Sequence, residues 1–370
     1  MVMQRVVIIG GGVMGCLTAL ELLESGRDVC LIERRSTGQE ASWAGGGIVT
    51  PLYPWRYSQP VTALAEWSQA HYPKLCRELF MHTGIDPELS PCGLIWLDHA
   101  EQEAALQWAE QQGKPITAVD GDFIYEQIPS LAPGFDQGMW QPQLANVRNP
   151  RLMAALGVRL QQFAGFSLLE NTEVSGLRIE GGRVKGVIYG GGQQAADAVV
   201  LAAGAWSGDW LAQFGLDLAV APVKGQMLIY KTAPGWLPSI VLHESRYAIP
   251  RRDGHILIGS TLEHVGYDTE ITFDALDSLR ASARSLLPDL ANLQPVAQWA
   301  GLRPGSPDGV PFVGAVAGID GLWLNTGHYR NGLVLAPASC RMLVDLMIGK
   351  LPEIDSQPYS VDGRMGPRTF

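Results

Sequence analysis

The sequence predicts an α/β fold, in which a Rossmann-like domain with a parallel sheet is interleaved with an α+β domain built on a mostly antiparallel sheet. Three observations predict it. The chain begins with a strand, a glycine turn, a helix and a second strand. Its middle part is rich in short alternating runs separated by turn residues, and its last part returns to a strand, a glycine loop and a long helix.

The first element is a βαβ unit. Residues 5–9 (RVVII) are a short β-branched run typical of a buried parallel strand. Residues 16–26 place leucines and alanine at helical spacing before Gly26, a helix-ending residue. Residues 28–33 (DVCLIE) then form a second strand that ends at Glu33. Two parallel strands with a crossover helix within about 30 residues make this unit.

Between the first strand and the helix, the sequence GGGVMG matches the pattern G-x-G-x-x-G, with Gly10, Gly12 and Gly15 at its three glycine positions. Gly10 permits a tight turn, Gly12 lets a pyrophosphate approach the backbone, and Gly15 lets helix and strand pack closely. Glu33 lies at the distance where a carboxylate accepts hydrogen bonds from a ribose. The pattern predicts a dinucleotide site and leaves NAD and FAD as alternatives.

The remaining elements follow from local patterns. Residues 41–54 are too small and glycine-rich for a regular element, whereas residues 63–83 look helical, with Pro73 starting, ending or kinking that helix. Residues 170–204 predict hairpins that turn at Gly181-Gly182 and near Gly190. Residues 223–231 predict an antiparallel strand, as do 246–251 and 255–261, which are joined through Asp253-Gly254.

Two later stretches carry expectations of their own. Residues 273–286 predict a helix with Phe273, Leu276, Leu279, Ala283 and Leu286 on one face, ended by Pro288. Residues 299–314 (WAGLRPGSPDGVPFVG) are so rich in Gly and Pro that they predict a loop. One permanent cation, Arg303, lies in it. Either this guanidinium points into solvent, or it binds an anion that the sequence does not contain.

Composition excludes several classes of protein. The chain has 370 residues, 46% hydrophobic and 17% charged, with a net charge of -10 and no basic block, which argues against a nucleic-acid partner. Five scattered cysteines without a CxxC pair fit a reducing compartment and no metal site. No apolar run is long enough to span a bilayer, so we expect a cytoplasmic protein with no membrane partner.

Six stretches occur in the order found in the FAD-dependent D-amino-acid oxidase superfamily, and they most resemble its glycine oxidases. They are VVIIGGGVMG, EASWAGGGIV, VVLAAGAWS, APVKGQM, WAGLRPGSPDGVPFVG and GHYRNGLVLAP. The resemblance extends to about residue 350 and favours FAD over NAD. It implies a discontinuous FAD-binding domain (residues 1–80, 146–220 and 300–365), a substrate-binding domain (81–145 and 221–299) and a homo-oligomer, a tetramer.

The resemblance also gives Arg303 a role, as the anchor of a substrate carboxylate, which a guanidinium binds in a bidentate manner. Tyr247 matches a tyrosine whose hydroxyl meets the same carboxylate, and Arg330 matches an arginine that lines the substrate cavity. Leu262 stands where the glycine oxidases carry Met, which implies an apolar cavity wall. No side chain is expected to act as a catalytic base, because hydride transfer needs only proximity and a deprotonated amine.

The resemblance implies non-covalent FAD, since GVPFVG lacks the flavin-linking cysteine of monomeric sarcosine oxidases. Backbone N–H groups of residues 330–333 would face the flavin pyrimidine, and His328 is expected to pack or hydrogen-bond rather than act as a base. Motif and resemblance together assign to the cofactor Gly10, Gly12, Val13, Met14, Gly15, Glu33, Arg34, Ser42, Gly46, Gly47, Ile48, Val174, Gly204, His328, Tyr329, Arg330, Asn331, Gly332 and Leu333.

The expected activity is the oxidative deamination of glycine, sarcosine and small D-amino acids, with O2 reduced to H2O2 and a role in thiazole formation for thiamine. One alternative is a D-amino-acid or sarcosine oxidase or dehydrogenase with another electron acceptor. A second is a flavin-binding module without catalysis, although such a module would need neither Arg303 nor Tyr247. A third is an NAD-dependent dehydrogenase, for which the sequence shows no nicotinamide half-site.

Overall fold

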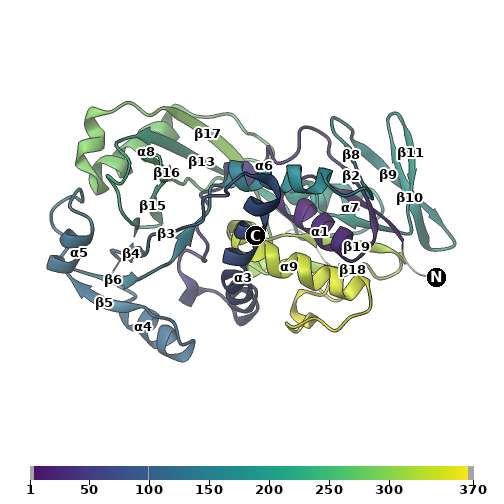
Figure 1. The fold of residues 1–370 in the computed structure, drawn as a ribbon, viewed down its shortest axis with the longest axis horizontal. Coiled ribbons are helices and arrows are strands. Elements are labelled where there is room, and N and C mark those ends of the chain that lie inside the picture. The colour runs from purple at the N-terminus through teal and green to yellow at the C-terminus, as the bar shows by residue number, and fades with distance from the viewer. Residues whose placement is uncertain (1–3, 99, 366–370) are drawn as a thin grey trace.

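A computed structural model describes residues 4–98 and 100–365 of the chain. The molecule is elongated, with one sheet at each end and the helices α3, α6 and α9 between them (Figure 1). Three of its helices are α3 (Gln59–Thr83), α6 (Asn149–Gln161) and α9 (Gly332–Met347). The predicted fold class is confirmed, because one sheet is mainly parallel and the other mainly antiparallel.

The first sheet has six strands in the order β18-β19-β12-β1-β2-β8. Its pairs are parallel except for the edge strand β18, which runs antiparallel to β19. The first βαβ unit is confirmed: β1 and β2 pair from Arg5 opposite Asp28 to Ile9 opposite Ile32, and α1 (Val13–Glu24) connects them. The strands are β1 (Arg5–Ile9), β2 (Asp28–Ile32), β8 (Phe166–Leu169), β12 (Ala198–Leu201), β18 (Phe312–Ala315) and β19 (Leu322–Thr326).

Two layers cover this sheet. On one face, α1, α3, α6 and α9 pack against one another and against buried residues such as Val6 and Ile8. On the other face, Val7 and Ile9 contact a three-stranded antiparallel sheet and α7 (Ser207–Ala212). The three strands are β9 (Val174–Glu180), β10 (Arg183–Tyr189) and β11 (Gly192–Ala195), so the hairpins predicted for this part of the chain are confirmed.

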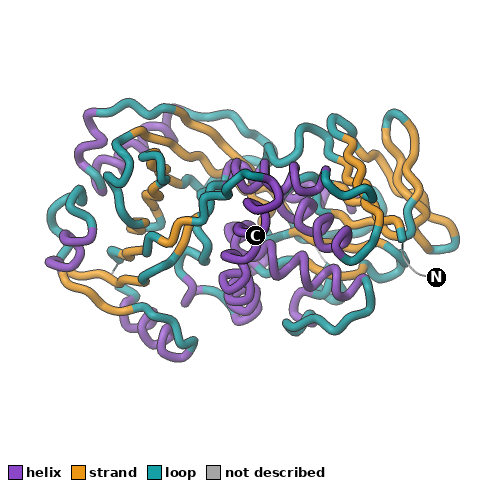
Figure 2. The backbone as a smooth tube through the Cα atoms, in the orientation of Figure 1, coloured by secondary structure: helices purple, strands orange, loops and turns teal. Residues whose placement is uncertain are grey.

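The second sheet has eight strands in the order β17-β13-β16-β15-β14-β4-β6-β5, and all its pairs are antiparallel except β14 with β4. The helices α4, α5 and α8 lie around it, away from the first sheet (Figure 2). The strands are β4 (Leu94–Trp96), β5 (Thr117–Asp120), β6 (Gln137–Gln141), β13 (Ala221–Lys231), β14 (Ile240–His243), β15 (Arg246–Pro250), β16 (His255–Gly259) and β17 (Ala297–Gly305). The helices are α4 (Gln102–Gln111), α5 (Gly121–Gln127) and α8 (Phe273–Leu286).

Three local predictions were wrong. Arg303 lies in a regular strand, β17, because nine residue pairs with β13 override the Gly and Pro residues that predicted a loop. Residues 41–54 contain a short helix, α2 (Ala41–Ala44). Phe273 is 85% exposed, because it is the first residue of α8 and lies beyond the face that packs on the sheet.

Pro73 lies in the interior of α3, which continues past it to Thr83. Two of the three alternatives, that Pro73 starts or ends a helix, are therefore wrong. Three of the predicted domain boundaries, at residues 80/81, 145/146 and 299/300, fall inside α3, β7 (Ala145–Asn146) and β17. A further two-stranded ladder joins β3 (Ser90–Pro91) to β7 (Ala145–Asn146) beside the segment that links the two sheets.

Candidate active site

A cavity of about 410 Å³ extends between the two sheets. This volume is in the usual range for a small-molecule or cofactor site. Its lining comes from both sheets and from loops spread between residues 9 and 334. The predicted site residues that line it are Gly10, Gly12, Val13, Met14, Glu33, Arg34, Ser42, Gly46, Gly47, Ile48, Val174, Gly204, Tyr247, Arg303, His328, Tyr329, Arg330, Asn331, Gly332 and Leu333.

The glycine turn after β1 forms one wall. Gly10 has a φ of +109°, which favours glycine, and a Cβ at Gly15 would lie 1.9 Å from the Gly10 carbonyl oxygen. Gly15 therefore serves helix–strand packing and is not among the cavity-lining residues. A Cβ at Gly12 would meet only Ser42 Oγ within 4 Å, which leaves the backbone open to the cavity.

The start of α1 borders the same wall. Ser42 Oγ accepts a hydrogen bond from Val13 N at 2.8 Å, so a residue from α2 caps α1. The positive end of the helix dipole is directed at the cavity, which suits a phosphate group.

Glu33, directly after β2, is 8% exposed. Its Oε2 accepts from Gly11 N at 2.7 Å and its Oε1 from Arg35 N at 3.0 Å. A carboxylate has about four acceptor positions, so it retains capacity for ribose hydroxyls. Arg34 stacks on the Trp206 ring at 3.6 Å and pairs with Glu40 at 3.1 Å.

Farther along the cavity, Gly204 has a φ of +54°, and a Cβ there would meet no protein atom within 4 Å. Since Gly204 lines the cavity, a side chain would occupy space that a ligand can fill. Val174 lies beside it, and its carbonyl accepts a hydrogen bond from Trp210 Nε1 at 3.1 Å.

The loop before α9 forms another wall. His328 is 1% exposed, and its Nε2 lies 3.0 Å from Ser339 Oγ. Burial lowers the pKa of His328 to about 3, so its ring is neutral. Residues 330–334 line the cavity where α9 begins, and its helix dipole favours negative charge there.

Arg303 lies at the end of the cavity formed by the eight-stranded sheet. Its guanidinium donates to Ser260 Oγ at 2.7 Å and to the carbonyls of Lys224 (3.2 Å) and Thr261 (3.3 Å). All three acceptors are neutral, and within residues 4–98 and 100–365 Arg303 forms no ion pair. Burial lowers the pKa of Arg303, and the positive charge of Arg330 lowers it further. This end of the cavity therefore attracts an anion.

Tyr247 lies beside Arg303 and is 7% exposed. A Cβ at Gly259 would lie 2.7 Å from the Tyr247 hydroxyl, and a Cβ at Gly225 would lie 2.3 Å from an Arg303 nitrogen. Two glycines in strands β13 and β16 thus make room for the two side chains. The two glycines lie near each other because β16 pairs with β13, and β16 also pairs with β15, the strand that carries Tyr247.

Like Gly15, Leu262 is a predicted site residue that the cavity does not include. It lies in the loop after β16, and its side chain is 47% exposed. Ser260, two residues earlier, lines the cavity instead and holds Arg303. The lining residues that sequence reasoning missed include Ser260, Thr50, Leu52, Met227 and Trp206. Of these five, Met227 and Trp206 had a signal, since both lie in quoted motifs, APVKGQM and VVLAAGAWS.

Comparison with known proteins places this geometry in a family. Residues 5–346 match the family described as FAD dependent oxidoreductase (DAO). The chain belongs to the FAD-dependent oxidoreductases. It is similar to a Pseudomonas aeruginosa protein named glycine oxidase, with 58% identity over 98% of this chain and 100% of the relative.

Two further relatives agree with this membership. The crystal structure of glycine oxidase from Geobacillus kaustophilus superposes with a TM-score of 0.92 and 32% identity, covering 98% of this chain and 100% of that one. A Synechocystis protein named bifunctional protein ThiO/ThiG is 31% identical over 93% of this chain, which matches 51% of its length. The predicted membership in this superfamily is therefore confirmed.

FAD is the cofactor of this family, and the cavity fits it. The backbone is open at Gly12, Glu33 has free acceptor capacity at one end, and the space beside Gly204 is unfilled by protein. The chain is an FAD-dependent oxidoreductase, as predicted.

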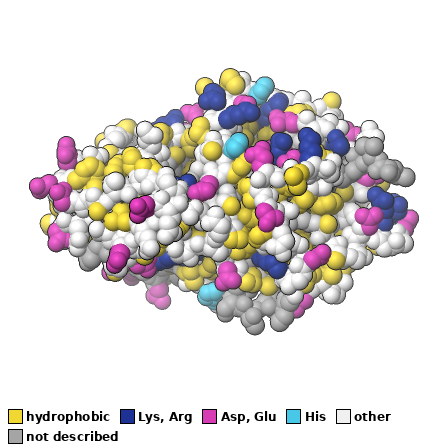
Figure 3. All heavy atoms as spheres, turned by 90° about the horizontal axis from the view of Figure 1, so that it is seen from below, with side chains coloured by type: hydrophobic (Ala, Val, Ile, Leu, Met, Phe, Trp, Pro, Cys, Tyr) yellow, Lys and Arg dark blue, Asp and Glu magenta, His cyan; other side chains and the backbone are white. Residues whose placement is uncertain are grey.

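Two absences concern the part of the chain that the structure describes. No helix there is long and apolar enough to cross a membrane. No group of three or more His, Cys, Asp or Glu side chains is arranged there to hold a metal ion. On the face shown in Figure 3, Lys and Arg side chains are interspersed with Asp and Glu, unlike a surface built for a polyanion.

Proposed function

We propose that this protein catalyses the oxidative deamination of glycine and of other small amines, including sarcosine and small D-amino acids. The observation that carries the proposal is Arg303, a cation at the cavity with neutral hydrogen-bond partners and no ion pair to any described carboxylate. The relatives named glycine oxidase support glycine as the substrate.

The chain's own residues position the substrate. Arg303 binds the substrate carboxylate through its planar fork, and the Tyr247 hydroxyl donates a hydrogen bond to the same group. Fixing the carboxylate orients the amine and the carbon–hydrogen bond toward the cofactor. Arg330 adds positive charge on the same cavity. The neutral His328, bonded to Ser339, holds the loop before α9 and is not a base.

FAD, when bound, would supply the hydride acceptor: the substrate carbon gives up two electrons and one proton as a hydride, the nitrogen of the resulting iminium releases a second proton, and O2 takes up both electrons and both protons as H2O2. The substrate amine becomes an imine, which water hydrolyses to an oxoacid and ammonia. The substrate enters with its amine deprotonated, so no side chain has to remove a proton.

The test is Arg303→Ala, with the exposed Arg252→Ala as the matched control. Loss of a charge-assisted bidentate pair costs several kcal/mol, so we expect the KM for glycine to rise about a hundredfold or more, with FAD still bound. Steady-state kinetics with peroxide detection and the visible flavin spectrum measure both effects. An unchanged KM in Arg303→Ala contradicts the anchor role.

A second measurement tests the substrate itself. Under anaerobic conditions, glycine should bleach the flavin spectrum of the purified protein, and sarcosine and D-alanine should bleach it at different rates. A spectrum that stays oxidised with glycine moves the proposal to a bulkier amine.

Several further assignments belong to this proposal. The cofactor-binding residues named above, the discontinuous division into an FAD-binding and a substrate-binding domain, a homotetramer and a cytoplasmic location are supported by the resemblance. The similarity to the ThiO/ThiG protein supports a role in thiazole formation for thiamine. Leu262, exposed beside Ser260, would affect substrate choice only if it moves on binding.

A further inference from the structure

A second arginine, Arg251, is buried near the cavity and has no role in substrate binding. It directly follows β15 and is 5% exposed. Its Nη1 donates to Asn146 Oδ1 at 2.6 Å and to the Val147 carbonyl at 2.9 Å, and its Nη2 donates to the Gly46 carbonyl at 2.8 Å. All of these acceptors are neutral, so Arg251 holds its positive charge without a direct ion pair.

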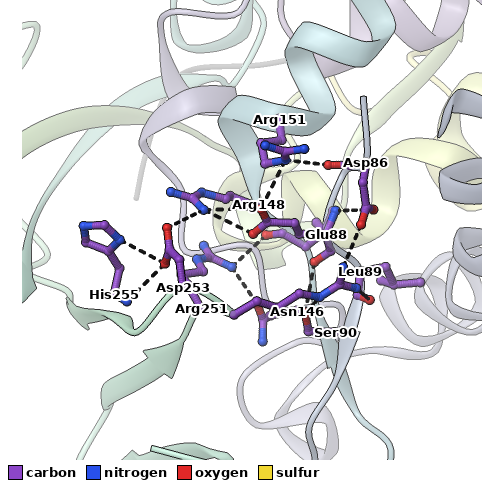
Figure 4. A network of polar contacts seen from close by, with 12 residues as sticks. Asp86, Glu88, Leu89, Ser90, Asn146, Arg148, Arg151, Arg251, Asp253 and His255 are labelled. Atoms are coloured by element: carbon purple, nitrogen blue, oxygen red, sulfur yellow. Dashed lines mark hydrogen bonds and ion pairs between the residues drawn. The ribbon is translucent and has the colours of Figure 1, made fainter. Parts of the chain in front are cut away.

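The carboxylates nearby are engaged by other side chains. Arg148 lies 2.9 Å from Asp253 and 3.2 Å from Glu88, and His255 lies 2.9 Å from Asp253. In Figure 4, Arg251 lies beside this network, and its dashed lines to labelled residues lead to Asn146. Among the described residues, no carboxylate forms an ion pair with Arg251.

Arg251 nevertheless stays protonated. Burial, and then the charge of Arg148, lower its pKa to about 10, although the negative charges of Glu88 and Asp253 offset part of this effect. This pKa is still far above neutral pH. The interior therefore contains a fixed positive charge at this place. Such a charge acts over a longer range than at the surface, because the surroundings screen it weakly.

The Gly46 carbonyl that Arg251 binds belongs to a segment that lines the cavity. Gly46, Gly47 and Ile48 all line it, and a Cβ at Gly46 would lie 2.7 Å from Ile249 and 3.4 Å from the Tyr247 ring. The segment is thus at the same end of the cavity as Tyr247. Only one peptide group separates the guanidinium of Arg251 from this wall.

Arg251 also joins this segment to its neighbour in space. Gly47 O accepts from Val147 N at 2.8 Å, and Ile48 forms an antiparallel bridge with Asn146. Arg251 donates to both sides of this contact, to Gly46 on one side and to Asn146 and Val147 on the other. It therefore fixes the position of the segment through three bonds from one planar group.

We propose that Arg251 is a positioning residue that fixes segment 46–48 against the bound FAD, and that its charge, which no direct ion pair neutralises, raises the reduction potential of that FAD. The proposal rests on the cofactor of the family and not on glycine as the substrate. A cation near the flavin favours the reduced form, which carries more negative charge than the oxidised form.

Two variants separate charge from position. Asn146→Asp keeps the acceptor for Arg251 and adds a carboxylate that neutralises it, so the reduction potential should fall while the Kd for FAD changes less than threefold. Arg251→Lys keeps the charge but replaces two separate donor nitrogens by one, which cannot reach Gly46 O and Asn146 Oδ1 at the same time. The potential should therefore stay near that of the parent, while the Kd for FAD rises at least tenfold. Arg252→Met is the control, since Arg252 is exposed and binds only Asp86, Ser90 and Leu89.

The potential is measured by anaerobic dye equilibration of the holoenzyme, and the Kd by titrating FAD into protein freed of it. Thermal unfolding of each variant confirms that it is folded. An unchanged potential in Asn146→Asp overturns the charge effect, and an unchanged Kd in Arg251→Lys overturns the positioning. Neither readout uses an amine, so failure here is distinct from failure of the Arg303 test.

Discussion

The two glycine segments that line the cavity, residues 10–15 and 45–48, are held by different parts of the chain. Residues 10–15 are fixed mainly within the first βαβ unit, where Gly10 N donates to Ile32 O at 2.9 Å and Gly11 N donates to Glu33. Residues 45–48 are fixed by residues 146–149, about 100 positions later in the chain, and by Arg251, about 200 positions later.

The comparison shows what makes a glycine pattern interpretable. When the supports of a turn lie in the same local unit, the spacing of the residues already indicates its geometry. When the supports come from distant segments, a glycine indicates only that some group approaches the backbone closely, and the sequence does not show which group it is. The predictions below test this difference.

The largest effect is expected for Gly15→Ala. The new methyl group would lie 1.9 Å from the Gly10 carbonyl oxygen, a backbone atom that cannot move without shifting α1 against β1. We expect the free energy of unfolding to fall by about 3 kcal/mol or more, measured by chemical denaturation. Gly157→Ala in α6 is the control, because its methyl group meets no atom within 4 Å and should cost nothing. Equal stability of the two variants would contradict the packing role.

Gly47→Ala should act on the cofactor more than on the fold. Gly47 has a φ of +80°, and a Cβ would lie 2.1 Å from the Val147 carbonyl oxygen. The left-handed conformation costs an alanine about 1–2 kcal/mol, and the clash moves the segment, so FAD affinity should fall at least about tenfold. Gly318→Ala has the same φ with no atom within 4 Å and isolates the conformational cost. Titration with FAD measures the affinity of each variant, and equal affinities for the two variants would count against an effect of the clash.

The loop before α9, which forms a third wall of the cavity, can be tested through the pH dependence of the free energy of unfolding. His328 has a folded pKa of about 3, below its ordinary value, so between these values the unfolded state binds the additional proton. The free energy of unfolding should therefore rise with pH over this window, by about 1.4 kcal/mol per pH unit for this group. His328→Gln, measured by denaturation from pH 4 to 6, should lose that part of the slope. Identical slopes would show that His328 does not titrate between the two states.

The smallest effect concerns Ser42, which connects the two glycine segments. It precedes residues 45–48 and accepts the hydrogen bond from Val13 N. Ser42→Ala removes one cap at a cost of about 1 kcal/mol, which corresponds to about a fivefold loss in FAD affinity if the helix start binds phosphate. Ser58→Ala is the control, because Ser58 precedes α3 without a side-chain cap. A loss as large in Ser58→Ala would indicate a nonspecific effect.

The sequence predicted those parts of the fold whose causes are local. The βαβ unit, the hairpins at Gly181-Gly182 and Asp253-Gly254, and helix α8 follow from periodicity and turn residues close in the chain. Arg303 was expected in a loop because its stretch is rich in Gly and Pro, but the strand depends on pairing with β13, about 80 residues earlier.

The site could be predicted only where a motif names its residues. About half of the residues in the six quoted motifs line the cavity. Leu262, which lies outside these motifs, does not line it, because the direction of a side chain in a loop depends on contacts that no pattern contains. Ser260 and Arg251 left no signal for the same reason. Ser260 meets Arg303 only after β16, β13 and β17 have paired in the second sheet, and Arg251 meets Gly46 only when segment 46–48 packs against residues 146 and 147.

The lining of the cavity also has a consequence for the synthesis of the protein. Its residues begin at Ile9 and end at Val334, and the wall before α9 comes from the last of them. A ribosome must therefore have released the chain as far as about residue 334 before the pocket exists. The flavin can be loaded only after that point of translation, and a nascent chain truncated before residue 328 should emerge without colour.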